Sequence, residues 1–354
     1  MTIARPTYCT REDVKRAPDV KFTARNNGDI DDAIEAASDA IDGLLHLKFY
    51  PVTMTRYWDW PNYQYAPPWK LYFDAWVMAD PSTAVVTSGG SLIPVGAIQW
   101  NPINEGPPYR WLELDRSTNY AFGAGKTPQR DISITGTWGW SVDTQSAGAL
   151  AAALNDTTGT AVQITDASLV GVGDNILIGT ERMLVTGRAN AATGQTQQGS
   201  GCATANNADV ALTVLDGTQI HAGEVLQLDS ERMLAVDVTG NVVTVRRAWD
   251  GTVLATHTGA TVYAQRLLTV TRGALGTTAA THANGTAVAR HLVPGLVREL
   301  AIAEAEVNVL QKTGGQARSQ GSGDNKRSGI GDRLPDLRAQ AVARFGRKMR
   351  TRTV

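Results

Sequence analysis

The sequence predicts an α+β protein in which a helical core with a few strands is interrupted by an inserted all-β domain of duplicated units. The first observation is a repeat, because the Glu-Arg-Met-Leu segment at residues 181–184 returns fifty positions later at residues 231–234. The second is an apolar stripe at helical spacing between residues 34 and 45. The third is period-two alternation, broken by Gly and Asp turns, between residues 155 and 292, which is typical of short strands.

The composition sets broad limits on the class of protein. The chain has 354 residues, enough for two or three domains, and its net charge of −1 creates no overall field that would draw it to nucleic acid or to a membrane. Its two cysteines, Cys9 and Cys202, are far apart and form no CxxC motif. A disulfide framework is therefore excluded, and folding in a reducing cytoplasm is expected.

Residues 1–150 are predicted to form the core. A first helix should begin after Thr10, which with Asp13 approximates a capping box, and should end at Pro18. A second helix is predicted from about Asp29 to Phe49, and Pro51 ends it. Its apolar stripe consists of Ile34, Ala37, Ile41, Leu44 and Leu45. Strands are predicted at residues 84–86, 111–114 and 131–137.

Residues 151–293 are predicted to be the inserted β-domain. The fifty-residue register also pairs Val162 with Leu212, Met183 with Met233 and Leu184 with Leu234 at equivalent positions, and the strand-facing apolar member of each pair should be buried. A second echo, at a spacing of twenty-five, relates Arg247, Gly251, Thr252, Thr256 and His257 to Arg272, Gly276, Thr277, Thr281 and His282. The units are either tandem or nested, with the second unit inside a hairpin of the first, and the pattern alone does not choose between these arrangements.

The C-terminal region divides into three segments. Residues 294–311 are predicted to be an amphipathic helix that returns to the core, and residues 312–332 a linker rich in Gly, Ser and Gln. Residues 333–354 are predicted to be a basic anchor, because nine Lys and Arg against two Asp from Lys326 onward give a net charge of +7. Three roles fit this anchor: a solubilising tail, a nucleic-acid arm, and a short helix that folds on a protein partner, which is the role we favour.

Motifs that carry chemistry are weak in this chain. The Gly123–Thr127 segment resembles the end of a phosphate-binding loop, but Tyr120 stands where the motif needs Gly and a strand follows, so a surface turn is expected. No two histidines have the spacing of a helical zinc site, and His257 and His282 should share a structural role. Asp229 and Glu231 fit a solvated hairpin edge better than a catalytic pair. We therefore expect no catalytic, metal-binding or cofactor-binding residues, and no enzyme.

A dense aromatic segment precedes the first predicted strands. Prolines interrupt it, which makes complete internal burial of its rings difficult, and Trp and Tyr are enriched at protein interfaces. The alternatives are burial in the core and stacking on a glycan. The candidate protein-interface residues are Trp58, Trp60, Tyr63, Tyr65 and Trp69.

Four segments together resemble the head–tail adaptor (connector) proteins of long-tailed bacteriophages. These segments are Tyr8–Val14, Ile30–Pro51, Asn104–Leu114 and Ile132–Trp140. In that family a helix follows the fourth segment, whereas here it is delayed until Pro294, so residues 151–293 are interpreted as an insertion into an adaptor core. The resemblance covers the regions on either side of this insertion and says nothing about the inserted domain.

The resemblance implies a structural protein of the virion neck, assembled in the host cytoplasm. Such proteins form a ring of about twelve copies between the portal protein and a stopper or tail-completion protein, and packaged DNA passes through the lumen without sequence-specific binding. The candidate portal-binding residues are Leu334, Leu337, Arg338, Arg344, Phe345, Arg347, Lys348 and Arg350. The alternative function is a β-repeat virion decoration protein that binds carbohydrate or acts as an adhesin.

Overall fold

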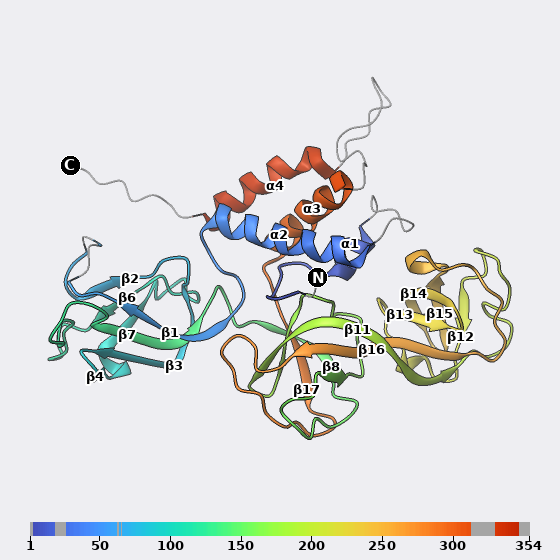
Figure 1. Ribbon diagram of the computed structural model, residues 1–354, viewed down its shortest axis with the longest axis horizontal. Coiled ribbons are helices and arrows are strands. Elements are labelled where there is room, and N and C mark those ends of the chain that lie inside the picture. Colours follow the sequence, from blue (N-terminus) through green and yellow to red (C-terminus); the bar gives the residue numbers. More distant parts are fainter. Residues whose placement is uncertain (1–2, 18–25, 62–63, 65, 313–329, 347–354) are drawn as a thin grey trace.

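Strands dominate the architecture of this protein (Figure 1). The computed structural model describes residues 3–17, 26–61, 64, 66–312 and 330–346. Strands account for 36% of the residues and helices for 21%, and the sheets are antiparallel and large, so the predicted α+β class with a helical adaptor core is wrong. The main reason is the region 52–138, which we had assigned to a helical core with few strands. Its β-branched and aromatic residues alternate at period two and form two sheets instead.

The helices come from the two ends of the described chain and pack together in one layer. They are α1 (Arg11–Arg16), α2 (Asn27–Leu45), α3 (Gly295–Lys312) and α4 (Ile330–Phe345). The predicted capping box at α1 is confirmed, because the Asp13 amide donates to the Thr10 side chain and the Thr10 amide donates to the Asp13 carboxylate. The predicted stripe of α2 is confirmed at four of its five positions, since only Leu44 is exposed.

Residues 52–138 form a unit that we call the aromatic β-domain. Its strands are β1 (Val52–Trp58), β2 (Lys70–Tyr72), β3 (Met78–Ser88), β4 (Ser91–Ile93), β5 (Ile98–Asn101), β6 (Trp111–Leu114) and β7 (Ile132–Trp138). They make a four-stranded sheet of order β1-β7-β3-β4 and a three-stranded sheet of order β2-β6-β5. Side chains of both sheets share one core, in which Trp138 is fully buried.

The remaining strands form one ten-stranded sheet. They are β8 (Thr144–Ala149), β9 (Ala161–Gln163), β10 (Asn175–Ile178), β11 (Glu181–Thr196), β12 (Ala211–Thr213), β13 (Val225–Leu228), β14 (Glu231–Thr239), β15 (Val242–Arg246), β16 (Thr261–Thr271) and β17 (Ala287–His291). The order is β12-β15-β14-β13-β16-β11-β10-β17-β8, and β9 also pairs with β16. The sheet therefore begins at Thr144, a few residues before the predicted start of the insertion.

This sheet closes on itself twice, because the long strands β11 and β16 serve two units. In unit 1 the order is β9-β16-β11-β10-β17-β8, and a bridge between Leu150 and Ile164 joins the last strand to the first. In unit 2, which spans residues 190–266, the order is β12-β15-β14-β13-β16-β11, and a bridge between Gln197 and Val214 closes it. Each unit encloses its own apolar core.

The two units are structural copies, and unit 2 is nested in unit 1. Leu184 pairs with Thr271 as Leu234 pairs with Arg246, and in both hairpins a bulge follows the next residue pair. Met183 and Met233 occupy equivalent positions, as predicted, and both are fully buried. The β14–β15 hairpin of unit 2 closes through a two-residue turn, whereas in unit 1 the whole of unit 2 takes the place of that turn.

The helical layer is fixed to unit 1 by main-chain hydrogen bonds. The amide of Thr7 donates to the Gly173 carbonyl, and the amide of Arg11 donates to the Val172 carbonyl, both at 3.1 Å. The His291 ring lies 3.1 Å from the Phe49 carbonyl through its Nε2. These contacts place the N-terminal segment and the end of α2 directly on the ten-stranded sheet.

The nesting predicts that either unit can be separated from the other. In unit 2 the turn Gly240-Asn241 joins the paired residues Thr239 and Val242, and Ala189 and Leu267 are the equivalent pair of unit 1. Replacing residues 190–266 by Gly-Asn should therefore leave a chain that melts cooperatively, and residues 190–266 alone should also fold. Circular dichroism during thermal unfolding checks both chains, and non-cooperative melting of both would contradict independent units.

Candidate functional site

Five aromatic side chains meet where the helical layer joins the β-structure, and we call this cluster the aromatic junction. It consists of Tyr8, Phe49, Tyr50, Trp140 and Phe345. The ring centroid of Phe49 lies 5.4 Å from that of Tyr8, 5.6 Å from that of Trp140 and 5.5 Å from that of Phe345. Tyr50 lies 6.0 Å from Tyr8, and Trp140 lies 5.0 Å from Phe345. The cluster thus ties both ends of the described chain to the strand region.

Polar contacts fix the position of Tyr8 in the junction. Its hydroxyl donates to the Asp42 carboxylate and accepts a hydrogen bond from the Phe49 amide at 3.2 Å. Lys48 Nζ lies 2.5 Å from the second Asp42 oxygen. Burial, with a contribution from Asp42, raises the pKa of Tyr8 well above its ordinary value. The tyrosine therefore stays protonated and serves as a fixed donor between α2 and the segment that follows it.

Three of the four segments that carry the adaptor resemblance supply rings to the junction, and the third segment lies beside it. Tyr8 belongs to the first, Phe49 to the second and Trp140 to the fourth. The third contributes Arg110, whose guanidinium lies 5.8 Å from the Trp140 ring centroid. Gly139, the residue before Trp140, lets the backbone pass close to Tyr50, because a Cβ atom at position 139 would lie only 2.4 Å from the Tyr50 carbonyl oxygen. Sequence spacing alone did not reveal that these segments meet.

The candidate portal-binding residues fall into three groups. Leu334, Leu337 and Phe345 are buried against the other helices. Arg338 makes a two-pronged ion pair with Glu304, at 2.6 and 2.8 Å, and Arg344 lies over the Phe345 ring. Arg347, Lys348 and Arg350 lie outside the described residues. A partner could contact Leu334, Leu337 and Phe345 only after α4 separates from the other helices. Portal binding through these residues therefore stays a prediction, and it requires that α4 separate first.

The candidate interface aromatics pack against the core of the aromatic β-domain. The Trp58 ring centroid lies 5.7 Å from that of Trp138, and the Trp60 centroid lies 5.0 Å from that of Phe122. Trp69 is half-buried beneath the Arg116 guanidinium. Tyr63 and Tyr65 lie outside the described residues. Burial in the core, which was the alternative to an interface role, therefore accounts for the buried parts of Trp58, Trp60 and Trp69. An interface role stays a prediction for their exposed parts.

A buried carboxylate holds each β-unit together, and we call these two sites the carboxylate hubs. In unit 1, Glu181 accepts hydrogen bonds from Arg272 Nε and Nη2 at 2.8 and 2.9 Å, and its Oε2 lies 2.9 Å from His282 Nε2. The amides of Gly273 and Ala280 donate to it at 2.8 and 3.0 Å. Glu181 is fully buried, so its charge is compensated entirely by these groups.

The hub of unit 2 repeats this geometry. Glu231 accepts from Arg247 Nε and Nη2, both at 2.7 Å, and from the amides of Ala248 and Ala255, both at 2.9 Å. His257 Nε2 lies 3.1 Å from Glu231, and its Nδ1 lies 2.8 Å from Asp229. The expected structural role of His257 and His282 is confirmed. Our prediction of a solvated edge is wrong for Glu231, which is fully buried.

The hubs keep their carboxylates ionised. Burial by itself would raise the pKa of Glu181, but the hydrogen bonds from Arg272, from the Ala280 amide and from His282 lower it to about 2. Glu231 has the same opposing causes, with Arg247 first among the groups that lower its pKa to about 2. Carboxylates with such low pKa values are poor general bases at neutral pH. The hubs act as cross-links between the two strands of each hairpin and the loop that follows.

The Gly123–Thr127 turn already contains an anion of the chain itself. Asp131 accepts hydrogen bonds from the amides of Gly123 and Gly125 at 3.0 and 2.6 Å, and from the Ser88 hydroxyl at 2.6 Å. A carboxylate therefore occupies the amide cradle where a phosphate would bind. The expected surface turn is confirmed, with a structural reason for its glycines.

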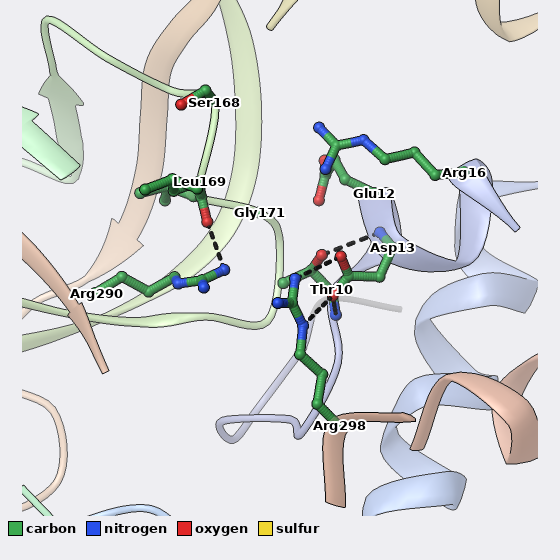
Figure 2. A pocket seen from close by; sticks show the side chains of 10 residues that line it. Thr10, Glu12, Asp13, Arg16, Ser168, Leu169, Gly171, Arg290 and Arg298 are labelled. Atoms are coloured by element: carbon green, nitrogen blue, oxygen red, sulfur yellow. Dashed lines mark hydrogen bonds and ion pairs between the residues drawn. The ribbon is translucent and has the colours of Figure 1, made fainter. Parts of the chain in front are cut away.

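A small polar cavity of about 50 Å³ lies where α1 meets unit 1 and the start of α3 (Figure 2). Arg298 donates to Asp13 at 2.7 and 3.2 Å, and Arg290 Nη1 donates to the Leu169 carbonyl at 2.8 Å. The cavity is polar and large enough to hold water. Near this joint, burial raises the pKa of Asp174 to about 7, although Arg290 and the Gly171 amide oppose it.

No group of three or more His, Cys, Asp or Glu in the described part of the chain could hold a metal ion. None of its helices is long and apolar enough to cross a membrane. Comparison of the chain with protein-family models, with curated proteins and with solved structures gave no match.

The hubs predict a specific loss of stability in acid. Glu181 has a pKa of about 2 in the folded protein and about 4.3 when unfolded. Its stabilisation is therefore present above about pH 4.3 and lost as the pH falls towards 2. Glu181→Gln should reduce the free energy of unfolding at pH 7 by about 3 kcal/mol or more. It should also flatten the decline in stability below pH 4.3, measured by denaturant titration at a series of pH values.

The exposed Glu299 on α3 provides the matched control. Glu299→Gln should change the free energy of unfolding by less than about 0.5 kcal/mol at pH 7. Equal effects of the two substitutions would show that Glu181 is not a structural hub.

Asp174 predicts the opposite pH dependence. Its pKa of about 7 in the folded protein exceeds the value of about 3.9 expected when unfolded. The contribution of Asp174 to the free energy of unfolding is therefore most favourable below about pH 3.9, and this contribution is lost as the pH rises through 7. Asp174→Asn should melt at a higher temperature than the unmodified protein at pH 8, and the difference should shrink as the pH falls towards 4. A lower melting temperature at pH 8 would rule out an unfavourable buried charge.

Proposed function

We propose that this chain is a structural protein of the neck of a tailed-bacteriophage virion, where it forms a ring between the portal and the tail. Its partners are the portal protein, a stopper or tail-completion protein and further copies of itself. Packaged DNA passes through the lumen of the ring without sequence-specific binding. No chemical reaction belongs to this role.

The aromatic junction is the observation that carries the proposal. Each of the four resemblance segments is short and weak by itself, and more than one hundred residues separate the first from the last. In the folded chain the first, second and fourth segments contribute Tyr8, Phe49 and Trp140 to one cluster, and the third places Arg110 beside the Trp140 ring. Segments that build one site together support the resemblance more strongly than the same segments scattered over the surface. The resemblance here concerns this junction and not the predicted helical core.

The arrangement of the parts also suits a ring subunit. The helical layer lies along one side of the molecule, and the aromatic β-domain, unit 1 and unit 2 lie in a row along the other side (Figure 1). Unit 2 is held at the end of this row by Lys15 of α1, whose Nζ lies 2.8 Å from Asp250. In the proposed ring the helical layer meets the portal, and the row of β-structure provides surfaces for neighbouring subunits and the stopper.

The position of the protein in the virion tests this proposal. Antibodies raised against residues 190–266 should label the narrow region between head and tail in electron micrographs of the phage that encodes the chain. The purified protein should form rings, seen by negative-stain microscopy and by light scattering after size exclusion. Label on the capsid surface or tail tip, with a monomeric or trimeric purified protein, would contradict the proposal and favour the decoration protein.

A further inference from the structure

Helix α4 fills a groove whose walls come from the rest of the helical layer and the aromatic junction. Its four inward side chains recur at a spacing of three or four residues and are at most 7% exposed. They are Leu334, Leu337, Ala341 and Phe345. At the end of the helix, the Phe345 ring meets Phe49 and Trp140 edge-on. The groove therefore recognises α4 through a regular apolar stripe and one terminal ring.

One ion pair sets the register of α4 in the groove. Arg338 Nε and Nη2 lie 2.6 and 2.8 Å from the two carboxylate oxygens of Glu304. The Glu304 side chain is 8% exposed, whereas that of Arg338 is 48% exposed. The arginine thus brings its charge to a largely buried carboxylate on α3, and a helix without a cation at this position would leave that carboxylate unpaired.

The joined ends of α3 and α4 are neighbours in space. Lys312, at the end of α3, lies 3.7 Å from Asp32 near the start of α2. Phe345, at the end of α4, lies against Phe49, which follows α2. Helix α3 therefore runs antiparallel to α2, whereas α4 runs parallel to α2. The two helices are thus antiparallel to each other, which places the start of α4 beside the end of α3 (Figure 1).

The connection between these ends is much longer than the fold requires. Antiparallel helices are usually joined by about 2–8 residues. Here residues 313–329 provide seventeen, including five Gly and three Ser. Seventeen residues can span at most about 60 Å when extended, and seven at most about 25 Å. The extra length gives α4 a reach of up to about 60 Å, far more than a return to its own groove requires.

We propose that α4 is exchanged between neighbouring subunits in the assembled ring, so that each groove holds the helix of the next copy. This inference rests on the proposed self-assembly and identifies the surface that joins the copies. An exchanged helix makes the same contacts with Phe49, Trp140 and Glu304, so exchange loses no packing. Within a ring, the neighbouring groove also has a high effective concentration, because the linker keeps α4 within reach of it.

Charge reversal at the ion pair tests the exchange. Glu304→Arg and Arg338→Glu each place like charges together in every groove of a homogeneous ring. Each variant alone should need about tenfold more protein to half-assemble, because an ion pair becomes a repulsion. An equimolar mixture should assemble like the unmodified protein, since every exchanged helix meets an opposite charge when the two variants alternate. The double variant Glu304→Arg/Arg338→Glu is the control, and it should assemble alone.

The mixture separates the two proposals. Rings of the double variant without rescue of the mixture would show that α4 stays in its own groove, and would overturn the exchange while leaving the neck protein intact. Failure of the unmodified protein to form rings would instead overturn the proposed function. Normal assembly of both single variants would show that the pair does not guide α4 between copies, which also counts against the exchange.

Shortening the connection gives a second, independent measurement. Deleting residues 316–325 leaves seven residues, enough for α4 to fold back on its own chain, and reduces the reach of the connection from about 60 to about 25 Å. The deletion should leave the melting temperature of the monomer unchanged and reduce assembly about tenfold, which is the loss expected when a tethered contact is removed. A variant with ten Gly and Ser residues in place of 316–325 is the matched control and should assemble normally. Full assembly of the shortened chain would overturn the exchange.

Discussion

The buried carboxylate at the base of each β-hairpin is the interaction on which the β-structure of this protein depends. A charge without access to water is costly unless every lone pair has a donor, and Glu181 and Glu231 each receive an arginine fork, two amides and a histidine. The donors come from parts of the chain that are distant from the glutamate, especially in unit 1, where Arg272 lies ninety-one residues away. A single side chain therefore requires the hairpin, the turn after it and the following loop to form together.

Each hub also positions a turn that binds another part of the molecule. In unit 1 the turn after Arg272 binds β1, because the Thr53 amide donates a hydrogen bond to the Leu275 carbonyl at 2.9 Å. The next residue is Gly276, where a Cβ atom would lie only 1.9 Å from the Thr53 carbonyl oxygen. In unit 2 the equivalent turn presents Asp250 to Lys15. The same local structure thus holds β1 in one copy and α1 in the other. Duplication of one unit has produced two attachment points with different chemistry.

Local patterns in the sequence predicted much of this structure, and long-range pairing accounts for the parts that they missed. The capping box at Thr10, the stripe of α2 and the equivalence of Met183 with Met233 depend on neighbouring residues or on direct repetition, and all were predicted. The nested arrangement depends on the partner of β11, which no local pattern contains. Glu231 was predicted to be solvated because it lies on a predicted hairpin, and its partner Arg247 lies beyond a turn, where no local pattern reveals it. The repeated order of Glu, Arg and His in both units was the signal that could have revealed the hubs.

The helical layer was misjudged for a related reason. Its apolar stripes were visible, but the aromatic residues between α2 and Gly139 did not show whether they would cover helices or build sheets of their own. In the structure Trp138 closes the core of the aromatic β-domain, while Trp140, two residues later, belongs to the junction. A helix-dominated core was therefore the wrong expectation for a segment that supplies both layers.

The nesting of unit 2 has a further consequence for the order of events during folding. Leu234 and its partner Arg246 are twelve residues apart, whereas Leu184 and Thr271 are eighty-seven apart, a difference of about 2 kcal/mol in chain-closure entropy. Once unit 2 has formed, however, its halves of β11 and β16 are already side by side, and the ladder of unit 1 can grow from them one residue pair at a time. Unit 2 is therefore expected to form first and to act as the kinetic nucleus for the unit that surrounds it.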